Sequence, residues 1–429
     1  MSRDHPRTRL EQLAIQQGIG TAEFVREFGR RAEVLGVDAA TSPSAAKRWL
    51  QGASGQPRAA TRRVLEAWFG EPLAALLGPP SECHPAATEE EIAVNAAHES
   101  VSHAIEAASA LDPSALEHLH AAAGHAAHAY YTTAPLEMLT DLVALRDTIY
   151  MQLDRTHKPL QHAELYLLAG QVCGLLSSVS WDLGMTGPSE EQARAAYTYG
   201  SIIDHPSLQA WARALQVTIA FWSGFPRKAN RIAAAALEQA PSGTARARLH
   251  SVNSRALALL GARDEVRDAL EAARLELDRA GDDAFLDEVG GELAFDRPRR
   301  GLCAGASYVA LGDGDRAERE AEDAVELFTA IPDGKRWGAG ILGARVDLAT
   351  ARTLRGDLAG TQDALSPVFE LPPARRTESI ALRLHSLAHM LGTILYRGAT
   401  EALQLGSEIE DFTAISLSRT SAMRALPPG

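Results

Sequence analysis

Residues 42–52 read Ser-Pro-Ser-Ala-Ala-Lys-Arg-Trp-Leu-Gln-Gly, and the rest of the chain is organised around this stretch. Ser42 is a good N-cap, because its side-chain oxygen can accept a hydrogen bond from a free amide of the first helical turn. Pro43 suits the first helical position, and Gly52 stands where a glycine typically ends a helix. The stretch therefore predicts a short helix with a defined start and end.

The side chains of this helix indicate contact with a negatively charged surface. Lys47 and Arg48 are adjacent cations, and Trp49 is an aromatic residue that can anchor the helix in a core. Ser44 and Ala45 are small enough to let the N-terminal end approach another surface closely. We interpret the helix as the recognition helix of a helix-turn-helix unit.

Three further helices are predicted around it, over residues 8–17, 21–36 and 58–69, each with apolar residues at helical spacing. In the second of these, Thr21 is the expected N-cap. Four aromatic residues are expected to form the core of the resulting domain: Phe24, Phe28, Trp49 and Trp68. These helices predict a small helical domain over residues 1–78.

Composition favours helix throughout the 429 residues, because 46% are hydrophobic, only 6% are aromatic, and alanine and leucine dominate. We therefore expect an all-α protein. The net charge is −13, but residues 1–80 carry +3 and the remainder −16. The positive balance is confined to the segment that contains the proposed recognition helix.

Residues 79–91 mix proline, small residues and acids and are predicted to be a linker, and residues 92–429 are predicted to be almost entirely helical. Within that region, glycines end successive apolar helices and are followed by alanine-rich helices. This pattern is typical of stacked helix pairs and predicts a tetratricopeptide-like α-solenoid. The repeat glycines are Gly184, Gly224, Gly261, Gly312 and Gly356, and the recurring alanines are Ala229, Ala233, Ala269, Ala273, Ala317, Ala321 and Ala324.

Two motifs carry a resemblance to a known family: Arg-Trp-Leu-x-Gly at 48–52 and Pro-Arg-x-x-x-Arg-x-Val-Leu-x-x-x-Phe-Gly at 57–70. With 164–171 and 358–373, they resemble actinobacterial, streptomycete-type Xre-like helix-turn-helix regulators with a C-terminal tetratricopeptide-like repeat domain. The resemblance implies a transcription regulator of development or secondary metabolism. The chain departs from the standard repressor pattern in its second helix, which is predicted to be about two turns longer.

The residues expected to contact DNA lie on the recognition helix and on the helix that follows it. The small residues and the lysine are expected at base edges and the arginines at phosphates. The set is Ser42, Ser44, Ala45, Lys47, Arg48, Arg58, Arg62 and Arg63. The expected partner is double-stranded DNA, bound by a homodimer.

The inner face of the repeat array is the expected ligand site, because stacked helix pairs leave a concave surface lined by the first helix of each pair. Gln216 and Asn253 each lie eight residues before a repeat glycine, at equivalent positions. Their amides could bind a peptide backbone or serve as ordinary contacts between helices. Trp211, Arg213 and Arg255 are neighbouring candidates. A peptide, a small molecule or a protein is the expected effector.

Catalysis is not expected, because the sequence contains no GxSxG, P-loop or GxGxxG motif with an acidic partner. His125 and His128 share the spacing of a helical face but lack further ligands, so neither a metal nor a cofactor is expected. Cys83, Cys173 and Cys303 are expected to be unpaired thiols of the cytoplasm. Residues 165–181 are apolar but short and interrupted by polar residues, so we expect a buried helix and no membrane association.

Three functional hypotheses remain open at this stage. The first is a cytoplasmic regulator whose binding to operator DNA is modulated through the repeat domain. The second is a non-enzymatic protein- or peptide-binding scaffold with a degenerate helix-turn-helix, which the long second helix favours. The third is a peptide receptor in which the repeats carry the main activity.

Overall fold

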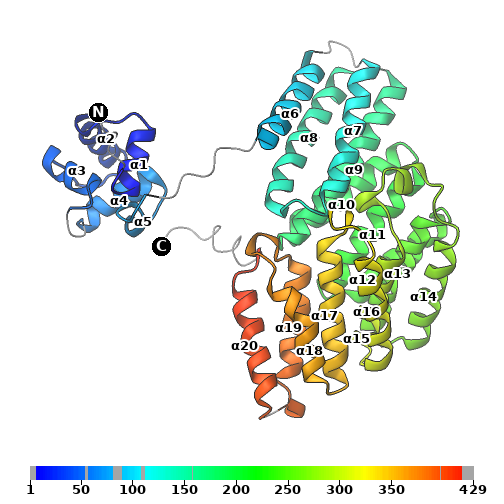
Figure 1. Ribbon diagram of the computed structural model, residues 1–429. Helices are drawn as coiled ribbons and strands as arrows, with labels where there is room; N and C mark the ends of the chain where they lie inside the picture. The colour runs from blue at the N-terminus through cyan, green and yellow to red at the C-terminus, as the bar shows by residue number, and fades with distance from the viewer. Residues whose placement is uncertain are drawn as a thin grey trace. The chain divides into compact units, whose positions relative to one another are not determined.

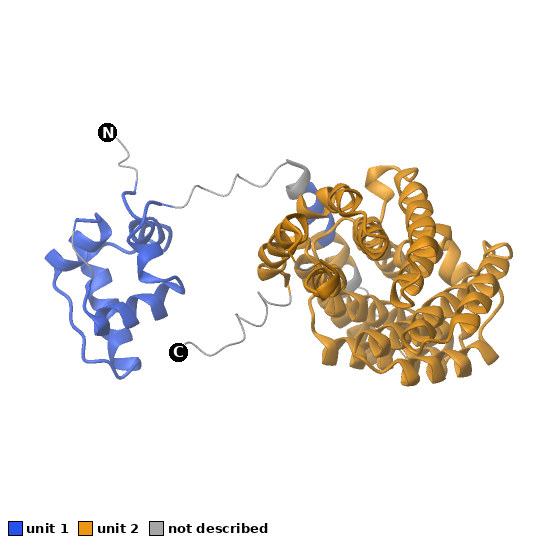
Figure 2. Ribbon diagram, turned by 90° about the horizontal axis from the view of Figure 1, so that it is seen from below, with its two compact units in different colours: residues 1–98 blue, residues 99–429 orange. Residues whose placement is uncertain are grey.

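The computed structural model describes residues 6–53, 57–80, 89–107, 112–156, 158–396 and 398–417. All regular secondary structure in these ranges is helical, which confirms the all-α prediction. The chain separates into two compact units, residues 1–98 and 99–429 (Figure 2). Residues 81–88 of the predicted linker and Cys83 lie outside the described ranges.

The first unit contains five helices before the boundary helix α6 (Figure 1). Gly20 is the N-cap of the second helix, whereas Thr21, the predicted cap, is its first residue. The helices are α1 (Arg9–Gln16), α2 (Thr21–Val34), α3 (Pro43–Leu50), α4 (Ala59–Phe69) and α5 (Leu73–Leu76), and α6 (Glu89–Ala107) contains the boundary between the units.

The core of the first unit is aromatic, as the sequence predicts. Phe24 and Phe28 of α2 are fully buried, and Trp49 and Trp68 are each 9% exposed. The ring of Phe24 lies 4.8 Å from that of Trp68, and Phe28 lies 6.0 Å from Trp49. These contacts fix one face of α3 and one face of α4 against α2.

The second unit consists of long helices joined by short turns (Figure 1). In order they are α7 (Pro113–Ala129), α8 (Pro135–Arg155), α9 (Pro159–Asp182), α10 (Thr186–Ile202), α11 (Pro206–Trp222), α12 (Pro226–Gln239), α13 (Thr244–Leu259), α14 (Arg263–Leu277), η1 (Ala284–Glu288), η2 (Gly291–Leu293), α15 (Arg297–Ala310), α16 (Gly314–Thr329), η3 (Asp333–Lys335), α17 (Gly338–Leu354), α18 (Leu358–Phe369), η4 (Pro373–Arg375), α19 (Glu378–Leu391), η5 (Ile394–Tyr396) and α20 (Thr400–Ala414).

The repeat pattern is confirmed at the level of the turns and of the packing. All five repeat glycines adopt a positive φ, between 69° and 82°, just after the end of a helix. A left-handed conformation of this kind ends a helix at little cost only with glycine. The seven recurring alanines are all buried. They lie on α12, α14 and α16, where small side chains allow neighbouring helices to approach closely.

The inner helices of the second unit are α9, α11, α13, α15, α17 and α19. Each contacts the next inner helix and also pairs with the outer helix that follows it in sequence. In addition, α19 contacts α9, so the six inner helices form a ring. Arg383 of α19 supports this closure, because its guanidinium lies 5.1 Å from the ring centroid of Trp222 on α11.

The helix α9 is the central core element of this unit. Among the described residues it is the one helix whose length and apolar composition would suffice to cross a membrane, and 78% of its most apolar window is buried inside the protein. Leu165, Leu168 and Val172 are fully buried. The prediction of a buried helix over residues 165–181 is therefore confirmed.

Candidate functional site

The helix α3 presents two contrasting faces. Ser42 caps it as predicted, because its Oγ accepts a hydrogen bond from the Ala45 amide at 3.2 Å. Ala46, Trp49 and Leu50 are buried against the core. Ser44, Lys47 and Arg48 are exposed on the other side, and Ala45 is half-buried between the two faces. The predicted DNA-contacting residues of α3 thus share one accessible surface.

Four of the predicted DNA-contacting residues are cations that form no ion pair with any described residue: Lys47, Arg48, Arg58 and Arg63. All four are exposed. Arg62 differs, because its Nε donates to Glu66 at 3.0 Å. The same carboxylate accepts the Leu73 amide at 2.8 Å, which ties the pair to the start of α5. Arg62 is therefore less available to a ligand than the other predicted arginines.

The connection between α2 and α3 runs from Leu35 to Ser42. A standard helix-turn-helix uses a turn of three or four residues. The α2 helix has 14 residues and ends at Val34, whereas the sequence predicts a helix over residues 21–36. The residues between α2 and α3 form a connection longer than that turn.

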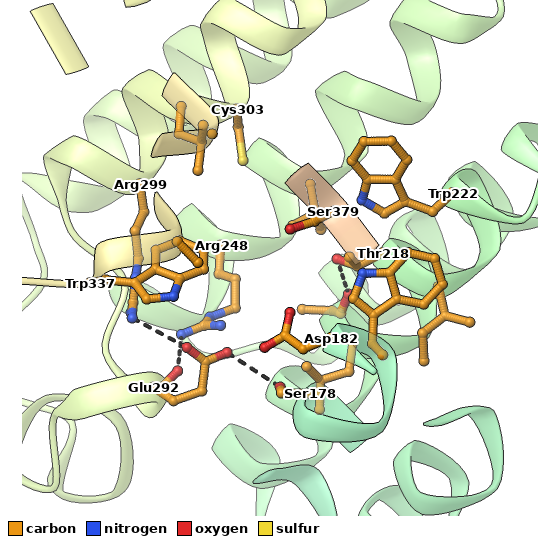
Figure 3. A pocket seen from close by; sticks show the side chains of 18 of the residues that line it. Ser178, Asp182, Thr218, Trp222, Arg248, Glu292, Arg299, Cys303, Trp337 and Ser379 are labelled. Carbon is orange, nitrogen blue, oxygen red and sulfur yellow. Dashed lines mark hydrogen bonds and ion pairs between the residues drawn. The ribbon is translucent and has the colours of Figure 1, made fainter. Parts of the chain in front are cut away.

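A cavity of about 140 Å³ lies at the centre of the ring of inner helices in the second unit (Figure 3). Residues from α9, α11, α13, α15, α17 and α19 all line it. The concave inner surface that the sequence predicts is therefore a partly open pocket, lined by the first helix of each pair. Its volume is suited to one aromatic ring, because a cavity of similar size in another protein holds benzene.

Three of the six tryptophans of the chain line this cavity: Trp181, Trp222 and Trp337. The rings of Trp181 and Trp222 are stacked with centroids 6.4 Å apart. Arg255 lies over Trp222, with its guanidinium carbon 4.6 Å from the ring centroid. Flat aromatic faces and guanidinium groups thus alternate along the wall of the cavity.

One end of the cavity contains a network of buried polar groups (Figure 3). The Nη2 atom of Arg248 donates to the backbone carbonyls of three successive residues, 292–294, at 2.6 to 2.9 Å. Arg299 pairs with Glu292 at 3.3 Å, and Ser178 donates to the same carboxylate at 3.3 Å. These contacts hold the η2 turn against α13 and α15. Arg299 Nη1 and Arg248 Nε have no hydrogen-bond partner among the described residues.

Asp182 lies at the same end of the cavity, at the C-terminal end of α9. Burial raises the pKa of its carboxyl to about 7, while Tyr130 opposes this by donating a hydrogen bond at 2.6 Å. The nearby Glu292 raises the pKa further. Asp182 is consequently divided between its protonated and ionised forms near neutral pH.

The other end of the cavity is organised by two arginines. Arg383 donates to Asp347 at 3.0 Å, and both side chains are buried. Arg255 contacts the rings of Phe221 and Trp222 but forms no hydrogen bond or ion pair with a described residue. Burial and the neighbouring Arg383 lower the pKa of Arg255 to about 10, so the group stays charged at neutral pH.

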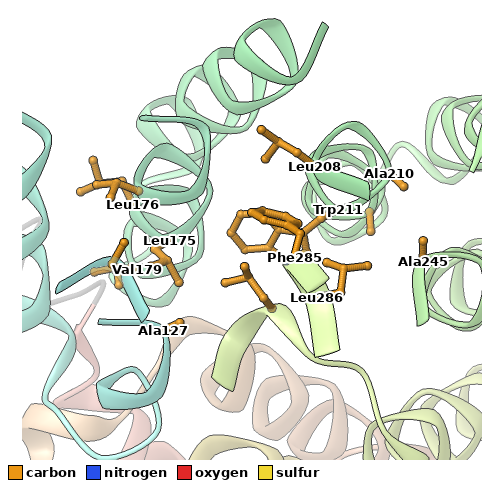
Figure 4. Packing of buried hydrophobic residues seen from close by; sticks show 14 of the residues in the cluster. Ala127, Leu175, Leu176, Val179, Leu208, Ala210, Trp211, Ala245, Phe285 and Leu286 are labelled. Atoms are coloured by element: carbon orange, nitrogen blue, oxygen red, sulfur yellow. The ribbon is translucent and has the colours of Figure 1, made fainter. Parts of the chain in front are cut away.

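Of the five predicted ligand residues, only Arg255 lines this cavity. The prediction for Trp211 is wrong: its ring is 1% exposed and packs against Phe285 in the apolar core (Figure 4). A Cβ atom at Gly174 would lie 2.1 Å from that ring, so the glycine makes room for it. Asn253 is also buried, at 7% exposure, and lines neither described pocket.

Arg213 and Gln216 are engaged with each other outside the central cavity. Arg213 donates to the Gln216 amide oxygen at 2.8 Å and stacks on Tyr197 at 3.6 Å. The Gln216 amide nitrogen reaches the Ala193 carbonyl at 3.4 Å. Arg213 lines a separate, open groove of about 620 Å³ beside α10 and α12. Of the two alternatives that the sequence left open for Gln216, the structure shows the contact between helices.

Sequence reasoning missed most of the cavity-lining charges. Asp182, Glu292 and Arg383 each have apolar or small residues on both sides in the chain, whereas Arg248 and Arg299 lie close to other charged residues. An isolated charge in an otherwise buried helix is the signal that could have revealed the first three, because such groups are rarely buried without a specific role. Within the described residues, no group of three or more histidine, cysteine or acidic side chains is arranged to hold a metal.

Comparisons with models of known protein families and with curated protein sequences found no match for this chain.

Proposed function

We propose that the protein is a DNA-binding transcription regulator whose operator binding is modulated through its helical repeat domain. The observation that carries the proposal is the exposed face of α3, where Lys47 and Arg48 stand unpaired opposite the buried Trp49. Unpaired cations on a rigid helix can neutralise phosphates without first breaking internal ion pairs.

The contacts follow from the placement of the side chains. Ser44 and Ala45 are small and allow the N-terminal half of α3 to approach base edges in the major groove, with Lys47 beside them. Arg48, Arg58 and Arg63 are free to bind phosphates, and Arg62 contributes after release from Glu66. A homodimer would place two such helices on two half-sites. The resemblance of the sequence supports a role in development or secondary metabolism, in the cytoplasm.

The test is selection of binding sites from a random library of double-stranded DNA with the full chain. The unmodified protein is expected to enrich a defined sequence, with two related halves if it binds as a dimer. The double variant Lys47→Ala/Arg48→Ala is expected to enrich none. The matched control Lys228→Ala/Arg267→Ala removes the same charge from exposed positions of the second unit and is expected to enrich the same sequence.

A protein-binding scaffold is the second candidate, because the connection from Leu35 to Ser42 departs from the short turn of DNA-binding motifs. In that case the first unit acts as a docking surface. Enrichment of no sequence by the unmodified protein, together with stable protein partners that depend on residues of the first unit, would replace the regulator by the scaffold.

A further inference from the structure

The central cavity of the second unit is lined by more positive than negative side chains. Four arginines reach it, Arg248, Arg255, Arg299 and Arg383, but only two acids, Asp182 and Glu292. Arginine does not lose its proton under physiological conditions. Because Asp182 is partly protonated near neutral pH, the excess of positive charge is larger than the count of side chains suggests.

The excess is concentrated at the end of the cavity formed by α11, α13 and α19. Arg383 is paired with Asp347, whereas Arg255 forms no ion pair with a described residue and feels the charge of the same Asp347 only from a greater distance. Both guanidinium groups lie against the ring of Trp222, at 5.1 Å and 4.6 Å. Arg255 is half-buried and donates no hydrogen bond to a described residue, so its guanidinium donors are available to a ligand. Arg255 and Arg383 therefore have one carboxylate, Asp347, between them. An anion from outside the chain would supply a second.

We infer that this cavity binds a small organic anion, a carboxylate with a flat apolar body. The carboxylate accepts hydrogen bonds from Arg255, and the flat body lies against the stacked rings of Trp181 and Trp222. A planar guanidinium matches a carboxylate in geometry as well as in charge. The four arginines disfavour a cation, and the volume of about 140 Å³ is too small for an extended peptide.

The opposite end of the cavity offers further donors. Arg299 Nη1 and Arg248 Nε are buried and have no hydrogen-bond partner in the described residues. Their residues are 4% and 7% exposed. Unsatisfied buried donors are uncommon in folded proteins. A second acceptor on the ligand, such as a hydroxyl or carbonyl oxygen, would satisfy them and set its orientation.

Binding at this site does not depend on the proposed DNA binding, although a regulatory effect of the ligand rests on it. The cavity is lined by all six inner helices, and α19 and α9 close their ring. A ligand that binds only the closed ring stabilises it by mass action. The anion would therefore favour one state of the second unit.

The experiment measures binding of benzoate to the full chain by calorimetry, thermal unfolding and tryptophan fluorescence, without DNA. Benzamide has the same shape without the charge, benzylamine has the opposite charge, and inorganic phosphate lacks the flat body. Benzoate is expected to bind, to raise the melting temperature and to change the fluorescence, since three of the six tryptophans line the cavity. The other three compounds are expected to bind more weakly by about tenfold or more, the loss of about one charge-assisted hydrogen bond.

The variant Arg255→Gln is expected to weaken benzoate binding about tenfold to a hundredfold. Without ligand it should melt at the same or a higher temperature than the unmodified protein, because it removes a charge that repels the neighbouring Arg383. The matched control Arg213→Gln removes an arginine that also stacks on an aromatic ring, outside the cavity, and should leave benzoate binding unchanged.

Three results would overturn the inference. The first is no benzoate binding up to about 10 mM, a concentration that detects millimolar affinities. The second is equal binding of benzamide, or tighter binding of benzylamine. The third is undiminished benzoate binding by Arg255→Gln.

Discussion

The candidate sites of the two units contain arginines in contrasting environments. In the first unit, Arg48, Arg58 and Arg63 are exposed and form no ion pair with a described residue. In the second unit, Arg299 and Arg383 are buried, and each is paired with an acid. An exposed unpaired cation costs little and is available to an external polyanion, whereas a buried one must be compensated inside the protein.

This difference separates residues that serve binding from residues that serve folding. Removal of an exposed cation from α3 should change affinity for DNA with little effect on stability. Removal of one partner from a buried ion pair should lower stability with little effect on affinity for DNA. Arg255 differs from these paired arginines, because it is half-buried and forms no ion pair with a described residue, and on this ground we propose that the cavity is a binding site.

The largest effect is expected from Asp347→Ala. This change leaves Arg383 and Arg255 together in the cavity wall without their one nearby acid. Breaking a buried pair in this way costs about 3 to 5 kcal/mol of the free energy of unfolding. The measurement is urea unfolding followed by circular dichroism. The control Asp264→Ala breaks an exposed pair with Arg267 and should cost less than about 0.5 kcal/mol. Equal losses of the free energy of unfolding in the two variants would contradict the difference between the buried and the exposed ion pair.

The second-largest effect is expected from Asp182→Asn, which should remove part of the pH dependence of the free energy of unfolding. The folded state holds the pKa of Asp182 at about 7, above its ordinary value of 3.8. The stabilising contribution is therefore complete below about pH 4 and is lost as the pH rises through 7. The free energy of unfolding that is lost in this way between pH 5 and pH 8 is about 2 to 3 kcal/mol.

Urea unfolding at pH 5 and pH 8 tests this, because other groups titrate equally in both proteins and cancel in the comparison. The amide introduced by Asp182→Asn would keep an acceptor for Tyr130 but cannot ionise, so the variant should lose less stability than the unmodified protein between these values. The same loss in both proteins would show that Asp182 does not titrate between these pH values and would contradict the prediction.

Much of the fold could be predicted from the sequence because its signals are local. The cap at Ser42, the repeat glycines such as Gly224 and the alanines such as Ala233 each act through their immediate neighbours in the chain. The ring of inner helices could not be predicted, because it depends on a contact between α9 and α19, which are about two hundred residues apart.

The candidate sites divide in the same way. The exposed face of α3 follows from helical periodicity within eleven residues. The cavity brings together residues from six helices, and the roles of Arg383 and Trp222 emerge only from their contact. Trp211 illustrates the error that results: it lies on an inner helix, as the repeat pattern predicts, but its side chain points into the core, where Gly174 makes room for it.

The smallest effect is expected from Ser42→Ala. The change removes the acceptor for the Ala45 amide at the start of α3. Loss of an N-cap costs about 1 kcal/mol, which corresponds to about fivefold faster exchange of the α3 amides if they exchange by local opening. Hydrogen exchange with mass spectrometry measures this by segment. The amides of α9 serve as the internal reference and should be unaffected, and a change there would contradict a local role for the cap.

The central claim is that unpaired cations of the first unit bind DNA phosphates, and the salt dependence of DNA affinity tests it most directly. With the selected DNA, log K against log salt should have a slope of about −3 to −4 per protomer, from four phosphate contacts. Lys47→Ala/Arg48→Ala should make the slope less negative by about 1, because Arg48 contacts a phosphate and Lys47 a base edge, while Lys228→Ala/Arg267→Ala, which removes two cations from the second unit, should leave it unchanged. A slope near zero, or one that the double variant does not alter, would contradict the account.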